Sequence, residues 1–251
     1  MAGRSNVGKS TLLNALLYGN RFTDVPENRT YVRGKTPEGA KLPKGSKAIV
    51  SNKPGETKQI TFYQLSCDVM KKKKQLTTTE EEEEEVVMTN DETKKKKKKK
   101  MTLLLVDLPG YGFAYTSEEK ALEWKRLMND YICNRSRKSL KRVLLLLDAR
   151  HGFKKTDYEF LTSLDSNDGN NVPPIQLVLT KCDLVSQNDL ARRVVQVKEQ
   201  FSNMFKRQPS SLPVMLVSAK AGLGFNNIRK GNAKGGILEL QRELAALVPK
   251  P

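Results

Sequence analysis

The chain has 251 residues, 37% hydrophobic and 6% aromatic, which is enough apolar sequence for a buried core. No apolar run approaches membrane-spanning length, and three cysteines with a single histidine suit neither a disulfide framework nor a zinc site. The formal net charge is +17, of which the lysine- and glutamate-rich stretch 66–100 supplies only +2. A basic body indicates a polyanionic partner, most simply RNA bound through salt-sensitive phosphate contacts, with general solubility as the plain alternative.

A phosphate-binding motif stands at the start of the chain. Residues 3–11 contain G-x-x-x-x-G-K-[ST] and run directly into an apolar helix over 12–17. Glycines let backbone N–H groups converge on phosphate oxygens, Lys9 brings a positive charge to the β- and γ-phosphates, and the Ser10 hydroxyl can bind Mg²⁺. The predicted nucleotide-binding residues of this loop are Gly3, Arg4, Ser5, Asn6, Val7, Gly8, Lys9, Ser10 and Thr11.

Only Met1 and Ala2 precede the loop, although such a loop normally leaves the end of a central strand in a parallel sheet. Loss of a central strand would leave two rows of buried backbone groups without partners. We therefore expect a truncated first strand and a native protein with upstream sequence.

Two long stretches read as insertions. After a helix end at Gly19-Asn20, residues 21–47 are rich in Pro, Gly, Lys and Arg and have no apolar period. A strand is predicted over 59–65, followed by blocks of lysine, threonine and glutamate over 67–100. Such charge runs cannot bury enough surface to order themselves, so we favour a solvated insert over an RNA-contacting loop.

Strands and helices alternate through the rest of the chain. Strands are predicted at 101–106, 143–147, 175–179 and 214–217, and helices at 188–205 and 237–247. Two more helices are expected to open at the capping boxes Thr116-x-x-Glu119 and Thr156-x-x-Glu159. The first of these carries an apolar stripe, interpreted as core, of Trp124, Leu127, Met128, Tyr131 and Ile132. This alternation predicts one α/β domain over 1–251 with a mostly parallel sheet and functional sites at the carboxyl ends of its strands.

Three strand ends carry residues suited to nucleotide chemistry. Asp107-Leu108-Pro109-Gly110 offers a carboxylate for Mg²⁺, through water, and the Gly110 N–H for a γ-phosphate. Thr180-Lys181-Cys182-Asp183 supplies a carboxylate for the N1–H and exocyclic amine of guanine. Because adenine has an acceptor at N1, a buried Asp183 would select GTP over ATP. The segment 217–220 adds backbone N–H groups, those of Ser218 and Ala219, for the guanine O6.

These motifs together resemble the TrmE–Era–EngA–EngB–Septin-like GTPases, and within them the EngB (YihA) family of ribosome-assembly GTPases. The resemblance rests on the motifs already described, on Lys53-Pro54-Gly55-Glu56-Thr57, on Tyr111-Gly112-Phe113-Ala114 after the Asp107 motif, and on Asp148-Ala149-Arg150-His151-Gly152. It covers nearly all of the chain outside 21–47 and 67–100. It implies a P-loop G domain with three layers and a six-stranded sheet.

The resemblance also implies roles for single residues. Gly55 and Thr57 would bind the nucleotide, with the Thr57 hydroxyl joining Ser10 and Asp107 around Mg²⁺. Tyr111 stands where many GTPases carry a water-orienting Gln, so slow intrinsic hydrolysis is expected. Asn6 could place K⁺ against the phosphates, as in potassium-activated relatives. The residues expected to act in hydrolysis are Lys9, Thr57, Gly110 and Asn6.

The implied function is a monomeric GTP-dependent switch that binds a precursor of the large ribosomal subunit. Bacterial members of the family are linked to cell division and septation. The low-complexity insertions look eukaryotic, and eukaryotic members are expected in mitochondria or plastids. The alternatives are an RNA-binding module in which GTP turnover is immaterial, and a P-loop ATPase or kinase, which Asp183 opposes.

Three further residues have plain structural interpretations. We expect Asp148 to cap the turn that follows it and His151 to be a partly exposed loop residue, rather than a proton-transfer pair. Cys182, next to the expected guanine site, is interpreted as a packing residue rather than a reactive thiol.

Overall fold

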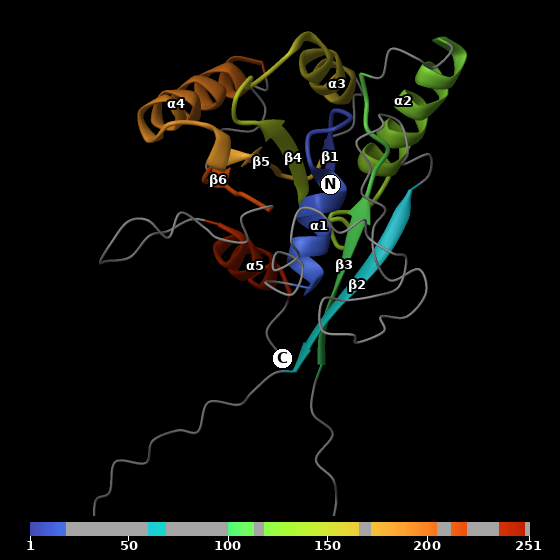
Figure 1. Ribbon diagram of the computed structural model, residues 1–251. Coiled ribbons are helices and arrows are strands. Elements are labelled where there is room, and N and C mark those ends of the chain that lie inside the picture. The colour runs from blue at the N-terminus through green and yellow to red at the C-terminus, as the bar shows by residue number, and fades with distance from the viewer. Residues whose placement is uncertain are drawn as a thin grey trace, which may run out of the picture.

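A computed structural model describes residues 1–18, 60–68, 100–112, 118–165, 172–204, 212–219 and 236–248 (Figure 1). The insertion predicted at 21–47, the helix end at Gly19-Asn20, the 53–57 motif and Thr116 lie outside these residues.

Four parallel strands form the main sheet. They are β1 (Ala2–Gly3), β4 (Val143–Asp148), β5 (Ile175–Thr180) and β6 (Met215–Leu216), in the order β1-β4-β5-β6. All residues of β4 and β5 are buried, as their continuous apolar runs predict for strands covered on both faces. The register pairs Asp148 with Thr180, so the two strands end at the same edge.

A second, antiparallel pair consists of β2 (Thr61–Asp68) and β3 (Lys100–Asp107). Its register runs from Thr61 opposite Asp107 to Asp68 opposite Lys100. The predicted bounds of the second insertion, 67–100, were therefore wrong at both ends, because residues 67, 68 and 100 belong to the ladder. The rest of that insertion lies outside the described residues.

The described residues do not form the single six-stranded sheet that was predicted: they form a four-stranded and a two-stranded sheet, which meet at a short seam. The Met1 amino group donates to Val106 O, and Leu108 N donates to Met1 O at 3.2 Å, which is the pattern of a parallel pair. Beyond it, Arg4 and Tyr111 form a parallel bridge. The first strand, expected to be truncated, has two residues, Ala2 and Gly3, which pair with Leu145 and Leu146. Because β1 has only two residues, it cannot carry a long ladder on both of its sides.

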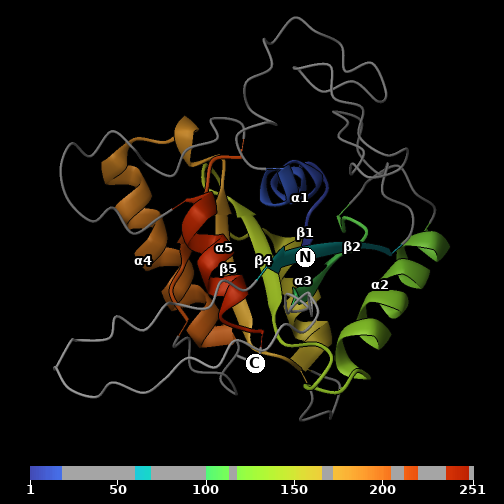
Figure 2. The same cartoon turned by 90° about the horizontal axis from the view of Figure 1, so that it is seen from below.

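Helices cover both faces and complete three layers (Figure 2). One face carries α1 (Lys9–Tyr18) and α5 (Ile237–Ala245), whose leucines share an apolar cluster with Leu144, Leu146 and Val178. The other face carries α2 (Glu118–Cys133), α3 (Lys155–Asp165) and α4 (Gln187–Met204), packed on Leu145, Leu147, Leu177 and Leu179. The predicted α/β P-loop fold is confirmed. None of the described helices is both long and apolar enough to span a bilayer.

Local sequence signals predicted some features of α2 and α3 and not others. α3 begins at Lys155, so Thr156 lies inside the helix and does not cap it. The capping carboxylate is Asp157, whose Oδ2 accepts from Lys154 N at 2.8 Å. On α2, Met128 and Ile132 are buried as predicted, whereas Leu127 is 41% exposed and lies off the core stripe.

Candidate nucleotide-binding site

The phosphate loop connects β1 to α1 at the carboxyl edge of the sheet. A Cβ on Gly3 would lie 2.8 Å from Leu146 O, so only glycine allows the loop to leave β1 this close to β4. Asn6 and Gly8 adopt positive φ values of 61° and 102°, and Leu12 N donates to Gly8 O at 2.9 Å to start α1. The loop thus curves around the N-terminus of a helix, which is a general anion-binding geometry.

Lys9 lies folded back over this loop and is 6% exposed. Its Nζ donates to Gly3 O and to Arg4 O, both at 3.1 Å. Burial lowers the pKa of Lys9 to about 8, and the nearby Asp107 carboxylate partly opposes that shift. A phosphate at the loop would give this ammonium the counter-charge that its own carbonyls supply only in part.

Asp107, at the end of β3, faces Ser10 at the start of α1. The Ser10 Oγ donates to Asp107 Oδ2 at 3.4 Å, while the buried Oδ1 has no hydrogen-bond partner within the described residues. Burial raises the pKa of Asp107, against the opposing effects of Lys9 and Ser10. A hydroxyl and an unsatisfied carboxylate oxygen suit Mg²⁺, which binds few protein groups and completes its shell with water and phosphate oxygens.

Gly110 packs directly on the phosphate loop. A Cβ at this position would lie 2.8 Å from Lys9 Nζ and 2.9 Å from Ser5 Cα. The structure therefore brings Gly110 next to Lys9 and Ser5.

The predicted base-binding motif, residues 180–183, is hydrogen-bonded to the phosphate loop by two side chains. The buried Thr180 hydroxyl lies 2.7 Å from Val7 O and 3.2 Å from Leu147 O, and donates to these carbonyls. Lys181 has a positive φ of 56°, and its Nζ donates to Asn6 O at 2.8 Å. The two predicted half-sites are thus physically connected.

Asp183 is exposed and lies in the short 3-10 turn Cys182–Leu184. Its Oδ1 accepts from the buried Ser218 Oγ at 2.6 Å, which fixes the carboxylate at the edge of the sheet. Cys182 between them is fully buried, its Sγ donates to Leu179 O at 3.1 Å, and burial raises its pKa to about 12. The thiol packs in the core, as interpreted from the sequence.

Asp148 has a partner that sequence reasoning missed. Its carboxylate accepts from the Arg150 backbone N–H at 3.0 Å, as expected of a turn cap, and His151 is exposed. Asp148 Oδ2 also pairs with Lys181 Nζ at 3.1 Å and with the Arg150 guanidinium at 2.8 Å. Burial alone would raise the pKa of Asp148, but these bonds outweigh it and hold the pKa well below its usual range.

A second missed group lies under the phosphate loop. The fully buried Asp157 accepts from the Tyr111 hydroxyl at 2.8 Å and pairs with Arg4 Nε at 3.0 Å. Tyr111 also stacks on Phe160, with ring centroids 4.6 Å apart. Burial raises the pKa of Asp157, and the bonds from Lys154, Tyr111 and Arg4 oppose the shift. Asp157 therefore connects α3, the phosphate loop and the segment after β3.

Arg193 of α4 is a third such group. Its guanidinium donates to three successive carbonyls, those of Ala149, Arg150 and His151, at 3.1–3.4 Å. It fixes the loop that presents Asp148 to Lys181. No local motif marks Arg193, because its partners lie more than 40 residues earlier in the chain.

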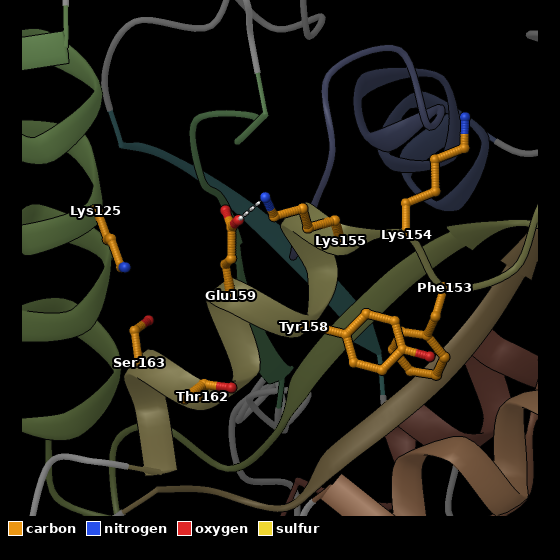
Figure 3. Close-up of a pocket in the computed structure, with 8 residues that line it drawn as sticks. All are labelled: Lys125, Phe153, Lys154, Lys155, Tyr158, Glu159, Thr162 and Ser163. Atoms are coloured by element: carbon orange, nitrogen blue, oxygen red, sulfur yellow. Dashed lines mark ion pairs between the residues drawn. The ribbon is translucent and has the colours of Figure 1, made fainter.

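A groove of about 640 Å³ lies elsewhere, between α2 and α3 (Figure 3). Lys125 and Glu159 reach into it from opposite sides, whereas Lys154 points away from the others, as Figure 3 shows. None of the predicted nucleotide-binding residues lines this groove. The predicted nucleotide-binding residues that the structure describes lie instead at the carboxyl edge of the sheet, whereas Gly55 and Thr57 lie outside the described residues.

Comparisons with known proteins agree with this geometry. The family model of the 50S ribosome-binding GTPases matches residues 1–181, and that of the elongation factor Tu GTP-binding domain matches 129–250. A relative named "Probable GTP-binding protein EngB" from Afipia carboxidovorans is 31% identical over 98% of this chain and 81% of its own length. Its counterpart from Cereibacter sphaeroides is 30% identical over 91% of this chain and 74% of its own length.

Solved structures of Era share the fold. One, a complex with MgGDPNP and nucleotides 1506–1542 of 16S ribosomal RNA, is 18% identical with a TM-score of 0.52. Another, Aquifex aeolicus Era Y63A bound to GDP.AlF4-, is 15% identical with a TM-score of 0.53. This chain is covered completely in both comparisons and spans 56% of each Era chain.

Proposed function

The chain belongs to the EngB family of GTP-binding GTPases, among the 50S ribosome-binding GTPases, and from this premise we propose that it is a slow, Mg²⁺-dependent switch in large-subunit assembly. In its GTP form it would bind a precursor of the large ribosomal subunit, and hydrolysis would release it. The observation that carries the proposal is the convergence of Lys9, Ser10 and Asp107 at the phosphate loop, with Asp107 Oδ1 left unsatisfied.

The proposed roles of the phosphate-binding residues follow from their contacts. The backbone of residues 3–8 and Lys9 would bind the β- and γ-phosphates, and Ser10, Thr57 and Asp107 would surround Mg²⁺. Gly110, whose Cα faces Lys9 Nζ, would offer its N–H to the γ-phosphate. When bound, Mg²⁺ supplies charge neutralisation for the phosphates.

Selection of guanine is assigned to Asp183, with Ser218 and Ala219 nearby. A carboxylate accepts two hydrogen bonds from the N1–H and exocyclic amine of guanine, and the Ser218 bond orients it for that task. Thr180 and Lys181 would hold this base site against the phosphate loop through Val7 and Asn6.

Slow turnover is proposed from the surroundings of Tyr111. Its hydroxyl is bonded to Asp157 and its ring is stacked on Phe160, so it is not available to orient an attacking water. We also propose that Asn6 helps K⁺ bind beside the phosphates. Equal GTP turnover rates in KCl and NaCl would contradict this.

An RNA partner is supported by the family, by the net charge of +17 and by the Era structure that contains ribosomal RNA. Residence in a mitochondrion or plastid, expected from the insertions, is a finer proposal that fractionation of cells making the protein would test.

The decisive experiment combines turnover with ribosome maturation. Ser10→Ala and Thr57→Ala should each lower GTP hydrolysis and fail to restore large-subunit assembly in cells that lack the protein. A matched Ser186→Ala change, at the cap of α4 far from the phosphates, should leave both readouts intact. If Ser10→Ala still matures ribosomes, the protein is instead a GTP-dependent RNA-binding module in which turnover is immaterial.

A further inference from the structure

A basic segment joins the end of α2 to the start of β4, at the edge of the sheet opposite the nucleotide site. Residues 134–142 contain five cations and no acid. Four of the cations, Arg135, Arg137, Lys138 and Lys141, are exposed. The fifth, Arg142, turns inward and bonds to Gln176 at 2.9 Å and Glu243 at 3.3 Å. The segment ends where Val143 begins β4. Since a strand rises about 3.3 Å per residue, that point lies roughly 17 Å from the Asp148 end of β4.

The segment is held in a fixed turn. Ser136 O accepts from Ser139 N at 3.0 Å, from Leu140 N at 2.9 Å and from the Ser139 hydroxyl at 2.9 Å. A turn with a fixed backbone loses little conformational entropy when its side chains bind a partner.

Two aromatic rings adjoin these cations, one exposed and one half-buried. Phe62 of β2 is 51% exposed, and its ring lies 6.1 Å from that of Tyr131 on α2, at an interplanar angle of 58°. The Arg135 guanidinium lies over the Tyr131 ring, 4.3 Å from its centroid. An exposed ring, a half-buried ring tilted against it and a guanidinium stacked on that second ring thus lie together beside the basic turn.

This combination fits single-stranded RNA. Cations along a groove or edge bind the phosphates, and aromatic and guanidinium planes stack on unpaired bases without regard to sequence. An acidic peptide would use the cations but would leave the exposed Phe62 ring without a flat partner.

We propose that Phe62, Tyr131, Arg135, Arg137, Lys138 and Lys141 form a binding surface for single-stranded RNA. The inference deepens the proposed function and rests on it for the kind of partner, since it names the surface through which ribosomal RNA would be held.

The test is binding of a fluorescent, mixed-sequence 12-nucleotide RNA to the full chain across a salt series. The triple change Arg137→Gln, Lys138→Gln, Lys141→Gln should weaken binding tenfold or more. It should also reduce the slope of log K against log salt by about 2, because each lost phosphate contact contributes about 0.7. Phe62→Ala should weaken binding about fivefold or more through lost stacking, with little change in slope.

A matched control removes the same charge from another surface. Lys155→Gln, Arg192→Gln, Lys198→Gln changes three exposed cations on α3 and α4 and should leave RNA affinity within twofold. All variants should keep the GDP affinity and melting temperature of the parent, which shows that the domain is intact.

Two results would overturn the proposal. One is an equal loss of affinity in the control triple variant, which would make the effect one of net charge. The other is heparin binding as strong as RNA binding together with no effect of Phe62→Ala, which would indicate a general polyanion patch. A failure of GTP to control ribosome association would count against the proposed function and would not alter these RNA measurements.

Discussion

Buried Lys9 ties nucleotide binding to pH. Because its pKa is about 8 in the nucleotide-free protein, Lys9 loses its proton as the pH rises through 8. Bound phosphates favour the charged form, so binding must then take up a proton. The same depressed pKa means that the unfolded chain binds more protons than the native one between pH 8 and 10.5, so this group destabilises the native state less as pH rises.

We expect GDP affinity to be nearly constant below pH 7.5 and to fall by up to about tenfold per pH unit above 8. Titration with a fluorescent GDP analogue between pH 7 and 9 measures this. Lys9→Arg, which keeps its charge throughout, should show a flat profile even if its affinity is lower. A parent profile as flat as that of Lys9→Arg would contradict the assignment.

Asp183 offers a second test at a single position. Asp183→Asn replaces one acceptor by an amide donor, which repels the N1–H of guanine but can pair with the 2-oxo group of xanthine. GTP affinity should fall by a hundredfold or more, and xanthosine triphosphate should become the better ligand. Competition binding with both nucleotides checks it, and Asp189→Asn, on the exposed start of α4, is the control. Unchanged preference for GTP would remove Asp183 from the base site.

Several of the predicted site residues lie together in the structure, and the sequence could group them because their motifs are local. The spacing of Gly3, Gly8 and Lys9 and the position of Asp107 at a strand end are properties of short segments. Sequence reasoning missed the Asp148–Lys181 pair and the Arg193 bonds because these join segments 33 to 44 residues apart that meet only when β4, β5 and α4 pack. No pattern in either segment alone signals such a contact.

The start of α3 is bonded to the phosphate loop, although the two are far apart in the chain. Asp157 caps the helix through Lys154 N and also binds Tyr111 and Arg4. A capping box was predicted with Thr156 as the cap, but the side chain that caps the helix is the carboxylate of Asp157. Asp157 also has two tertiary partners, Tyr111 and Arg4. Tertiary bonds thus decided where α3 begins.

Tyr111→Phe should lower the free energy of unfolding by about 1–3 kcal/mol, because it removes one bond to a buried carboxylate and keeps the stack on Phe160. At this chain length each kcal/mol shifts the melting temperature by about 2–4 °C, which thermal denaturation resolves. Tyr158→Phe, at the rim of the α2–α3 groove, is the matched control and should be nearly neutral. Equal effects of the two changes would show that Tyr111 has no special connection to α3.

The strands differ in how well sequence composition alone predicts them. Apolar runs identified β4 and β5 because both faces of these strands are buried. The ends of β2 and β3 were missed because residues 67, 68 and 100 lie in a polar, charged stretch of sequence. They join the ladder through backbone pairing, which composition does not predict.

For the whole molecule, the nucleotide should act as a stabilising ligand. Saturation with GDP and Mg²⁺ at 100 times Kd adds about 2.7 kcal/mol to the native state. A melting temperature about 5–11 °C higher is therefore expected. EDTA should remove part of the shift and Ser10→Ala should reduce it, whereas ADP should give none. An equal shift with ADP would contradict selection of guanine.

The bonds from Thr180 to Val7 O and from Lys181 to Asn6 O have a consequence for cooperativity. They hold the places for the base and for the phosphates at a fixed separation before any ligand arrives. A guanine nucleotide would then behave as a bidentate chelator, whose second end binds at a high effective concentration once the first is seated. Guanosine and pyrophosphate added as separate molecules would lose that advantage. The binding free energy of each would be less than half of the binding free energy of GDP.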